Sequence, residues 1–205
     1  YFAKLGLQPG GDNGAYLQSF EVATGVRVKQ PTSLTLGDQP ALTLNQDWIP
    51  LGFSVSKKVE AQVVFAGYGI TVKEYGYDDY ESIDAKGKIV IVLRYEPPPK
   101  HANSPFRRYP DYSVHAALRT KANNARDHGA LGMILVDLHP QDDAKRELIS
   151  TTNSLWRAGT SLVAAQVRRA PIEKWLDGHG VSLTELGDKI DHAETPASNE
   201  VRAEK

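Results

Sequence analysis

Several apolar segments of the chain predict buried β-strands. Residues 87–95 contain an unbroken run of β-branched and other apolar residues, and residues 131–136 repeat this pattern. Such runs are typical of strands that are covered on both faces, as in parallel sheets. Residues 61–70 and 161–167 predict two further strands, the first with glycines that permit a bulge or a close backbone approach.

A helical pattern follows the strand predicted at residues 87–95. Small and apolar residues recur every three to four positions within residues 112–129, and Gly129 is expected to end the helix. The predicted stripe consists of Val114, Ala117, Leu118, Lys121, Ala122 and Ala125. Because this helix lies between strands 88–95 and 131–136, the three segments predict a right-handed β-α-β unit with parallel strands.

Shorter elements are expected on either side of this unit. Helices are predicted at residues 171–178 and 182–192, the latter with Ser182 as its N-cap and Glu185 completing a capping box. Turn-forming residues dominate the first 56 positions, where alternating stretches such as residues 16–22 predict hairpins. Residues 33–36 and 42–44 repeat that alternation, and residues 1–7 look like the last turn of a helix that ends at Gly6.

Composition narrows the class of protein. The 205 residues are 40% hydrophobic, which is enough for one domain with a proper core. Lys plus Arg total 24 against 25 for Asp plus Glu, so the chain lacks the basic excess of nucleic-acid-binding domains. No apolar run approaches the roughly 20 residues that a membrane span needs. The absence of cysteine removes disulfides, thiolate zinc sites and cysteine nucleophiles.

Three segments carry side chains that could perform chemistry, and each has a structural alternative. Asp137, His139 and Asp142 follow a predicted strand and could bind a metal, although a solvated turn is the more ordinary interpretation. Asp78 and Asp79 could form a general acid/base pair, but adjacent side chains usually point apart and could instead cap a turn. Residues 67–69 resemble half of a phosphate-binding loop without its third glycine, so bulge glycines are favoured.

The segment from Glu96 to Pro110 is the strongest candidate for a contact surface. It holds five of the twelve prolines. Guanidinium groups match carboxylates, so a stiff exposed loop with two arginines suits carboxylate or peptide recognition. The candidate substrate or partner contacts are Phe106, Arg107, Arg108 and Tyr109. The alternative is a long crossover loop with solvated charges.

Two groups of motifs resemble a known family. Residues 64–70, 75–80 and 83–94 resemble the "vf.GyGi…yddy…d.kGKivlv.R" pattern of protease-associated (PA) domains, and residues 121–136 resemble the family's "K..nA..hGA.gvilv" segment. The variety is similar to PA domains of secreted bacterial di-zinc aminopeptidases, relatives of plasma glutamate carboxypeptidase and the transferrin receptor. The resemblance covers roughly residues 1–185. It implies a mixed α/β fold, the three-layer β/β/α swivelling arrangement.

The resemblance also implies an organisation and a role. Residues 1–10 correspond to the end of a peptidase-domain helix, 11–193 to the PA domain, and 194–205 to a linker towards a peptidase domain that carries the zinc. No catalytic residue or metal ligand carries over to this chain, so a non-catalytic domain that modulates substrate access or binds protein is expected. Its implied partners are that peptidase domain and a peptide or protein substrate, in an extracellular or periplasmic location. The alternatives are a stand-alone protein-binding module and a small hydrolase that uses His139 with Asp137 and Asp142.

Overall fold

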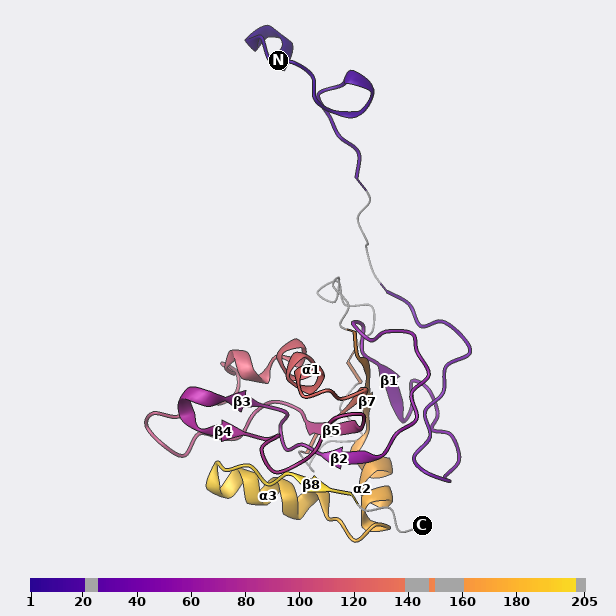
Figure 1. Ribbon diagram of the computed structural model, residues 1–205, viewed down its shortest axis with the longest axis vertical. Helices are drawn as coiled ribbons and strands as arrows, with labels where there is room; N and C mark the ends of the chain where they lie inside the picture. The colour runs from indigo at the N-terminus through magenta and orange to yellow at the C-terminus, as the bar shows by residue number, and fades with distance from the viewer. Residues whose placement is uncertain (21–25, 139–147, 150–160, 202–205) are drawn as a thin grey trace.

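A six-stranded mixed sheet forms the centre of the protein (Figure 1). The computed structural model describes residues 1–20, 26–138, 148–149 and 161–201. The strand order is β1-β7-β6-β5-β2-β8, with parallel pairing from β7 through β2 and antiparallel pairing of the outer strands β1 and β8. The strands are β1 (Trp48–Pro50), β2 (Val63–Phe65), β5 (Ile89–Leu93), β6 (Gly132–Val136), β7 (Val163–Val167) and β8 (Asn199–Glu200).

Helices and a second, two-stranded sheet cover the central sheet. Strand β3 (Thr71–Val72) pairs with β4 (Tyr77–Asp78) across the 3₁₀ helix Lys73–Tyr75. The α-helices are α1 (Leu118–Asp127), α2 (Arg169–Asp177) and α3 (Leu183–Ala193), and further 3₁₀ helices span Phe2–Leu5, Asp12–Gly14 and Val114–Ala116. In Figure 1, α1 lies on one side of the sheet and α3 on the other. The mixed α/β fold predicted from the sequence is confirmed.

The two faces of the sheet bury two separate cores. Along β5, Val90 and Val92 belong to the core under α1, while Ile91 and Leu93 belong to the core that α2, α3 and β3–β4 cover. All four side chains are fully buried, as the continuous apolar run predicts. Helix α1 approaches closely because Ala122 and Ala125, both fully buried, face the sheet.

The central β-α-β unit is confirmed, with β5 and β6 in parallel register from Ile89 and Gly132 onwards. The helix between them is shorter than the sequence predicts. Ala117 adopts an extended backbone (φ −65°, ψ 129°) that separates the 3₁₀ helix from α1, and Val114 is 75% exposed. His128 is the C-cap, and Gly129 follows it in the left-handed region at φ 79°.

Other predicted elements differ in extent. Helix α2 begins two residues before the predicted start, and α3 begins as predicted, with the Ser182 hydroxyl accepting the Glu185 backbone N–H (3.2 Å). Residues 33–36 and 42–44 approach through one backbone bond from Leu42 to Leu34 (2.9 Å) rather than as paired strands. Of residues 16–22, the described part, 16–20, is not a strand, and the rest lies outside the described residues.

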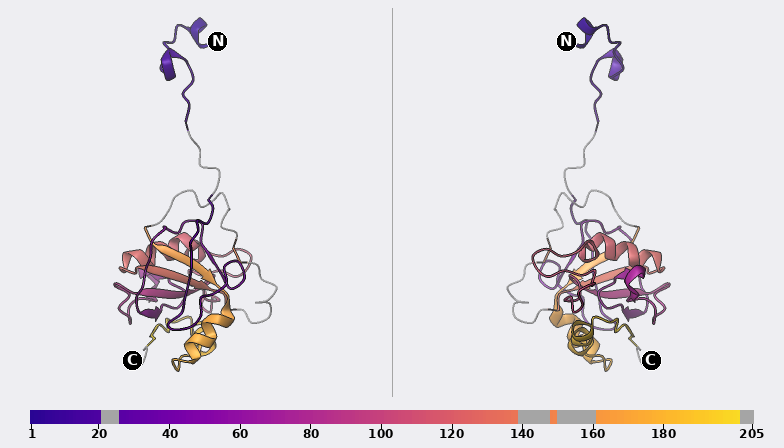
Figure 2. Two further views of the ribbon diagram at one scale, coloured as in Figure 1. Left: turned by 90° about the vertical axis from the view of Figure 1, so that its right-hand side faces the viewer. Right: turned by 90° about the vertical axis from the view of Figure 1, so that its left-hand side faces the viewer.

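Residues 1–20 form an arm that projects from the rest of the chain (Figure 2). The first turn is a 3₁₀ helix rather than an α-helix, and Gly6 ends it at φ 75°. The arm folds on itself, since the Tyr16 hydroxyl donates to the Leu7 carbonyl (2.7 Å) and the Phe2 ring lies 5.7 Å from the Tyr16 ring. At the other end, β8 adds an edge strand beside β2, and Val201 is buried. No helix among the described residues is long and apolar enough to cross a membrane.

A buried carboxylate joins the small sheet to the large one. Asp79 follows β4 and is fully buried, where it accepts hydrogen bonds from the Ile70 backbone N–H (3.0 Å) and the Tyr77 hydroxyl (3.0 Å). Lys121 of α1 is also fully buried and donates to the Tyr68 carbonyl. Desolvation raises the pKa of Asp79 to about 7 and lowers that of Lys121 to about 7, and the attraction between the two charges opposes both shifts.

The strand predicted at residues 61–70 ends at Phe65 because the chain turns around this carboxylate. Gly67 has φ 48°, and a Cβ there would lie 2.2 Å from Asp79 Oδ1. Gly69 has φ 68°, and a Cβ there would lie 2.8 Å from Val92 Cγ1. The glycines therefore permit the close backbone approach that the sequence suggested, and no phosphate loop is formed.

Removal of one charge of this pair should be more damaging than removal of both. We expect Lys121→Met to reduce the free energy of unfolding by about 3 kcal/mol or more, because it leaves the Asp79 carboxylate buried without its cation. Adding Asp79→Asn should recover part of that loss, because the neutral amide can still accept the Ile70 N–H. Urea melts of the single and double variants measure this, with Lys174→Met, at an exposed position of α2, expected within about 0.5 kcal/mol of the parent. Strict additivity of the two single losses would contradict the coupling.

The space at Gly67 gives a second prediction. Gly67→Ala should cost at least about 2 kcal/mol more than Gly76→Ala, because only the former displaces a buried, hydrogen-bonded carboxylate. Gly76 has a comparable φ of 72° with no atom within 4 Å of its Cβ position, so Gly76→Ala reports the backbone strain alone, about 1 kcal/mol. Equal losses for the two variants in denaturant melts would refute the steric argument.

Candidate functional site

The candidate contact loop leaves the sheet at the carboxyl end of its parallel strands. Arg94 follows β5 and Asp137 follows β6, and the two side chains form an ion pair at this edge (Nη1 to Oδ2, 3.4 Å). Open α/β sheets bind ligands outside the carboxyl ends of their strands. The loop from Glu96 to Ser113 therefore starts at the edge of the sheet where a contact surface is expected.

The buried Glu96 carboxylate fixes the backbone of the loop. Its side chain is 4% exposed, and Oε1 accepts the backbone N–H groups of Arg107 (2.9 Å) and Ser113 (2.6 Å). The Ser113 hydroxyl donates to Oε2 of the same carboxylate. One buried side chain thus joins the start, the middle and the end of the loop.

A second buried carboxylate, Glu194, holds the outer part of the loop. Glu194 caps the C-terminus of α3 with a left-handed backbone (φ 53°), and its Oε2 accepts the Lys100 backbone N–H. Desolvation raises the pKa of Glu194, but hydrogen bonding to Ser104, the Lys100 N–H and Tyr75 outweighs it and holds the pKa below the ordinary value of 4.5. The loop is therefore bound to α3 by an ionised carboxylate.

Phe106 does not lie where a contact residue should lie. Its side chain is 1% exposed, and its ring packs edge-on against Tyr77 (5.0 Å) and Tyr75 (6.3 Å) in the core. Burial of an apolar ring is favourable, and the apolar side chains of β3–β4 offer the Phe106 ring a place in the core. Phe106 thus anchors the loop, and the surface candidates are reduced to Arg107, Arg108 and Tyr109.

The three remaining candidates are exposed together. Arg107 Nη1 donates to the carbonyls of Ser104 and Phe106 (both 3.2 Å), and Arg108 Nη2 donates to that of Pro99 (3.4 Å). Tyr109 is 81% exposed. Each guanidinium has five N–H donors, so these bonds orient the groups and still leave donors for a ligand.

Two tyrosines that the sequence did not single out extend this surface. The Tyr95 and Tyr112 rings stack at 4.7 Å, and the Tyr109 ring lies 6.2 Å from Tyr112. The Arg94 guanidinium lies 4.7 Å from the Tyr95 ring centre. Tyr95 has a left-handed backbone (φ 70°), which is unusual for a bulky residue and is found at functional sites. Only the tertiary fold brings together residues 17 positions apart, so local patterns could not reveal this row.

The other predicted constellations have structural roles or lie outside the described residues. Asp78 Oδ1 accepts from the Thr71 hydroxyl (2.8 Å) and the Tyr80 N–H (2.9 Å), which is the turn-capping role. Asp79 is buried in the core, so the two carboxylates do not form an acid/base pair. His139 and Asp142 lie outside the described residues, and Asp137 is paired with Arg94. Within the described part of the chain, no group of three or more His, Cys, Asp or Glu side chains is arranged to hold a metal ion.

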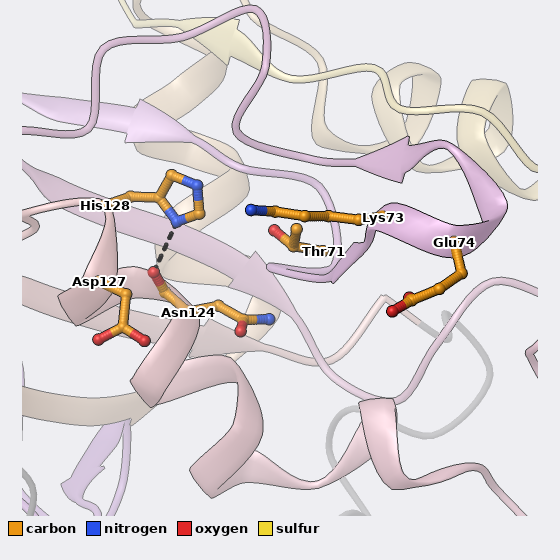
Figure 3. Close-up of a pocket in the computed structure, with 6 residues that line it drawn as sticks. All are labelled: Thr71, Lys73, Glu74, Asn124, Asp127 and His128. Atoms are coloured by element: carbon orange, nitrogen blue, oxygen red, sulfur yellow. Dashed lines mark hydrogen bonds between the residues drawn. The ribbon is translucent and has the colours of Figure 1, made fainter.

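A cavity of about 420 Å³ lies between the Thr71–Glu74 segment and the end of α1 (Figure 3). Its lining residues are Thr71, Lys73, Glu74, Asn124, Asp127 and His128. His128 stacks on Tyr80 (4.1 Å), and its Nδ1 is 2.8 Å from the Asn124 carbonyl oxygen. In Figure 3 the Lys73 side chain extends towards the imidazole. Because the lining mixes acids and bases, this cavity does not favour a ligand of one charge.

The fold and the motif positions define a mixed α/β domain of the protease-associated class. The PA domain family model matches residues 59–174, more than half of the chain, and the chain therefore belongs to the PA domain family. The residues that carried the resemblance lie within this match.

Among solved structures, an aminopeptidase from Aneurinibacillus sp. strain AM-1 is similar to this chain at 17% identity and a TM-score of 0.42. The similarity covers 65% of this chain and 24% of the aminopeptidase, so it spans about a quarter of that enzyme. No curated protein matches the chain significantly.

The hydrogen bonds of the Glu194 carboxylate to the loop predict a contribution to the free energy of unfolding that is lost in acid. Because its folded-state pKa lies below 4.5, ionised Glu194 stabilises the fold above about pH 4.5, and this contribution is lost as the pH falls through the folded-state pKa. Glu194→Gln should therefore be less stable than the parent at pH 7, and the difference should narrow as the pH falls below about 4.5. Urea midpoints at pH 7, 5 and 3 measure it. A difference that stays constant or widens towards acid would show that the carboxylate charge does not hold the loop.

Proposed function

We propose that this chain is the non-catalytic PA domain of a zinc-dependent aminopeptidase, in which it shapes the access of peptide to a neighbouring active site. Membership of the PA family supports the assignment to a peptidase, since such domains are typically non-catalytic parts of peptidases. The observation that carries the role is the geometry of the loop. Buried Glu96, Glu194 and Phe106 fix it from beneath while Arg107 and Arg108 face solvent.

The proposal includes the partners and the place of action. The domain would pack against a peptidase domain of the same protein, and that peptidase domain would hold the zinc. We assign no zinc ligand to this chain. The substrate would be a peptide or a protein, and the location extracellular or periplasmic, as for the secreted enzymes that the motifs resemble.

The fixed loop explains how such a domain could contribute to binding. A loop that is already ordered loses little conformational entropy when a peptide binds, so weak contacts can still contribute. Exposed ion pairs contribute at most about 1 kcal/mol each, roughly a fivefold change in affinity. Contacts made equally in the bound and transition states change KM and leave kcat unaffected.

Kinetics of the complete enzyme test this role. Arg107→Ala combined with Arg108→Ala should raise KM for peptides about three- to tenfold and leave kcat within about twofold, because the contacts lie away from the reacting bond. Arg126→Ala removes an exposed arginine of α1 that pairs with Asp127 (2.8 Å) and should leave both constants unchanged. An unchanged KM for short and long peptides in the double variant would contradict the loop contact.

The same assays separate the alternatives. If the 205-residue chain alone hydrolyses aminoacyl substrates with added zinc, and His139→Ala abolishes that turnover, the small-hydrolase hypothesis replaces the proposal. If the chain binds a protein partner in the absence of any peptidase domain, the hypothesis of a stand-alone binding module replaces the proposal.

A further inference from the structure

The exposed loop concentrates positive charge in a chain that is otherwise balanced. From Pro97 to Pro110 the sequence contains Lys100, Arg107 and Arg108, with His101, and no aspartate or glutamate. The chain as a whole carries 24 Lys plus Arg and 25 Asp plus Glu. Residues 97–110 therefore form a local run of cations that differs from the average composition, and the carboxylates of the loop are Glu96 and Asp111 at its two ends.

Two of the three nearest acids are turned inwards, while Asp111, whose backbone N–H donates to the Arg108 carbonyl (2.9 Å), is exposed. Glu96 is 4% exposed and bonds to the Arg107 and Ser113 N–H groups, and Glu194 is equally buried and bonds to the Lys100 N–H. These carboxylates hold the backbone of the loop, while the side chains of Lys100, Arg107 and Arg108 are exposed. The loop thus exposes three cationic side chains and one carboxylate, Asp111, while the two carboxylates that hold its backbone are buried.

The tyrosine row (Tyr95, Tyr112 and Tyr109) adds an aromatic surface beside these cations. It runs from the end of β5, where Tyr95 has its strained backbone, to Tyr109, which directly follows Arg108. Tyrosine supplies large contact area at a low cost in conformational entropy, and arginine adds charge-assisted hydrogen bonds. Together these are the residue types enriched where proteins recognise peptides.

On the basis of the proposed function, we infer that the loop and the tyrosine row form a surface that selects acidic peptides. Carboxylate side chains of the peptide accept hydrogen bonds from the Arg107 and Arg108 guanidiniums, and its backbone lies against the Tyr109 and Tyr112 rings. An extended peptide fits better than a nucleic acid, because the chain has a net charge of −1, whereas phosphate-backbone binding relies on an excess of Lys and Arg.

Binding of matched peptides to the 205-residue chain tests the inference. The probe is a dye-labelled ten-residue peptide of alternating Glu and Ala, and its control is the same peptide with Gln in place of Glu. Fluorescence anisotropy at low salt should show at least about fivefold tighter binding of the Glu peptide, with the preference shrinking at about 0.5 M salt.

Variants assign that preference to the surface. Arg107→Gln with Arg108→Gln should remove the preference for the Glu peptide, whereas Arg126→Gln should keep it. Tyr109→Ala should weaken both peptides by a similar factor, since it removes contact area and no charge. Circular dichroism checks that each variant is folded, which is expected because all these side chains are exposed.

The outcomes separate this inference from the proposed function. Equal binding of the two peptides overturns the selection for acidic peptides and leaves the loop contact with peptide standing. Binding of neither peptide overturns the inference, and the proposed function fails only if KM of the complete enzyme is also unchanged in the double alanine variant. Tighter binding of a single-stranded oligonucleotide than of the Glu peptide overturns it in favour of nucleic acid.

Discussion

The buried Asp79 carboxylate is the interaction on which the rest of the structure depends. It accepts the Ile70 N–H and the Tyr77 hydroxyl, and so joins the turn after β2 to β4, while Lys121 brings α1 to the same point. Removing two charges from water is costly, so the pair persists only because hydrogen bonds and mutual attraction compensate. Since β4 also supplies Tyr77, against which Phe106 packs, the position of the contact loop depends on this carboxylate.

Two buried carboxylates determine the conformation of the basic loop. Glu96 and Glu194 accept backbone N–H groups of a loop whose own side chains are cationic. Backbone groups buried without partners are costly, and a proline-rich loop cannot satisfy them through regular structure. The two carboxylates meet this need at the Arg107, Ser113 and Lys100 N–H groups. The same side chains therefore stabilise the backbone conformation in which Arg107 and Arg108 are exposed.

The sequence predicted the regular core well because the signals there are local. The apolar run of β5, the alanines of α1 and the Ser182 cap each determine their element from a few neighbouring residues. The surface that we propose as a peptide contact could be read from the sequence only in part. Arg107, Arg108 and Tyr109 were visible in a proline-rich segment, but the burial of Phe106 depends on a cluster formed by β3 and β4. Tyr95 and Tyr112 meet only because the loop returns to the sheet edge, which no local pattern encodes.

The outer strands of the sheet have a consequence for how the domain can be handled as a separate piece. Strand β8 covers the edge of β2, and at the opposite side β1 ends in Pro50, which has no N–H to offer to another strand. Uncovered edges invite pairing between molecules and aggregation. A fragment that ends before residue 199 would expose the backbone N–H and C=O groups of β2. The short strand β8 therefore protects the domain against aggregation. Shortened versions of the domain should keep them.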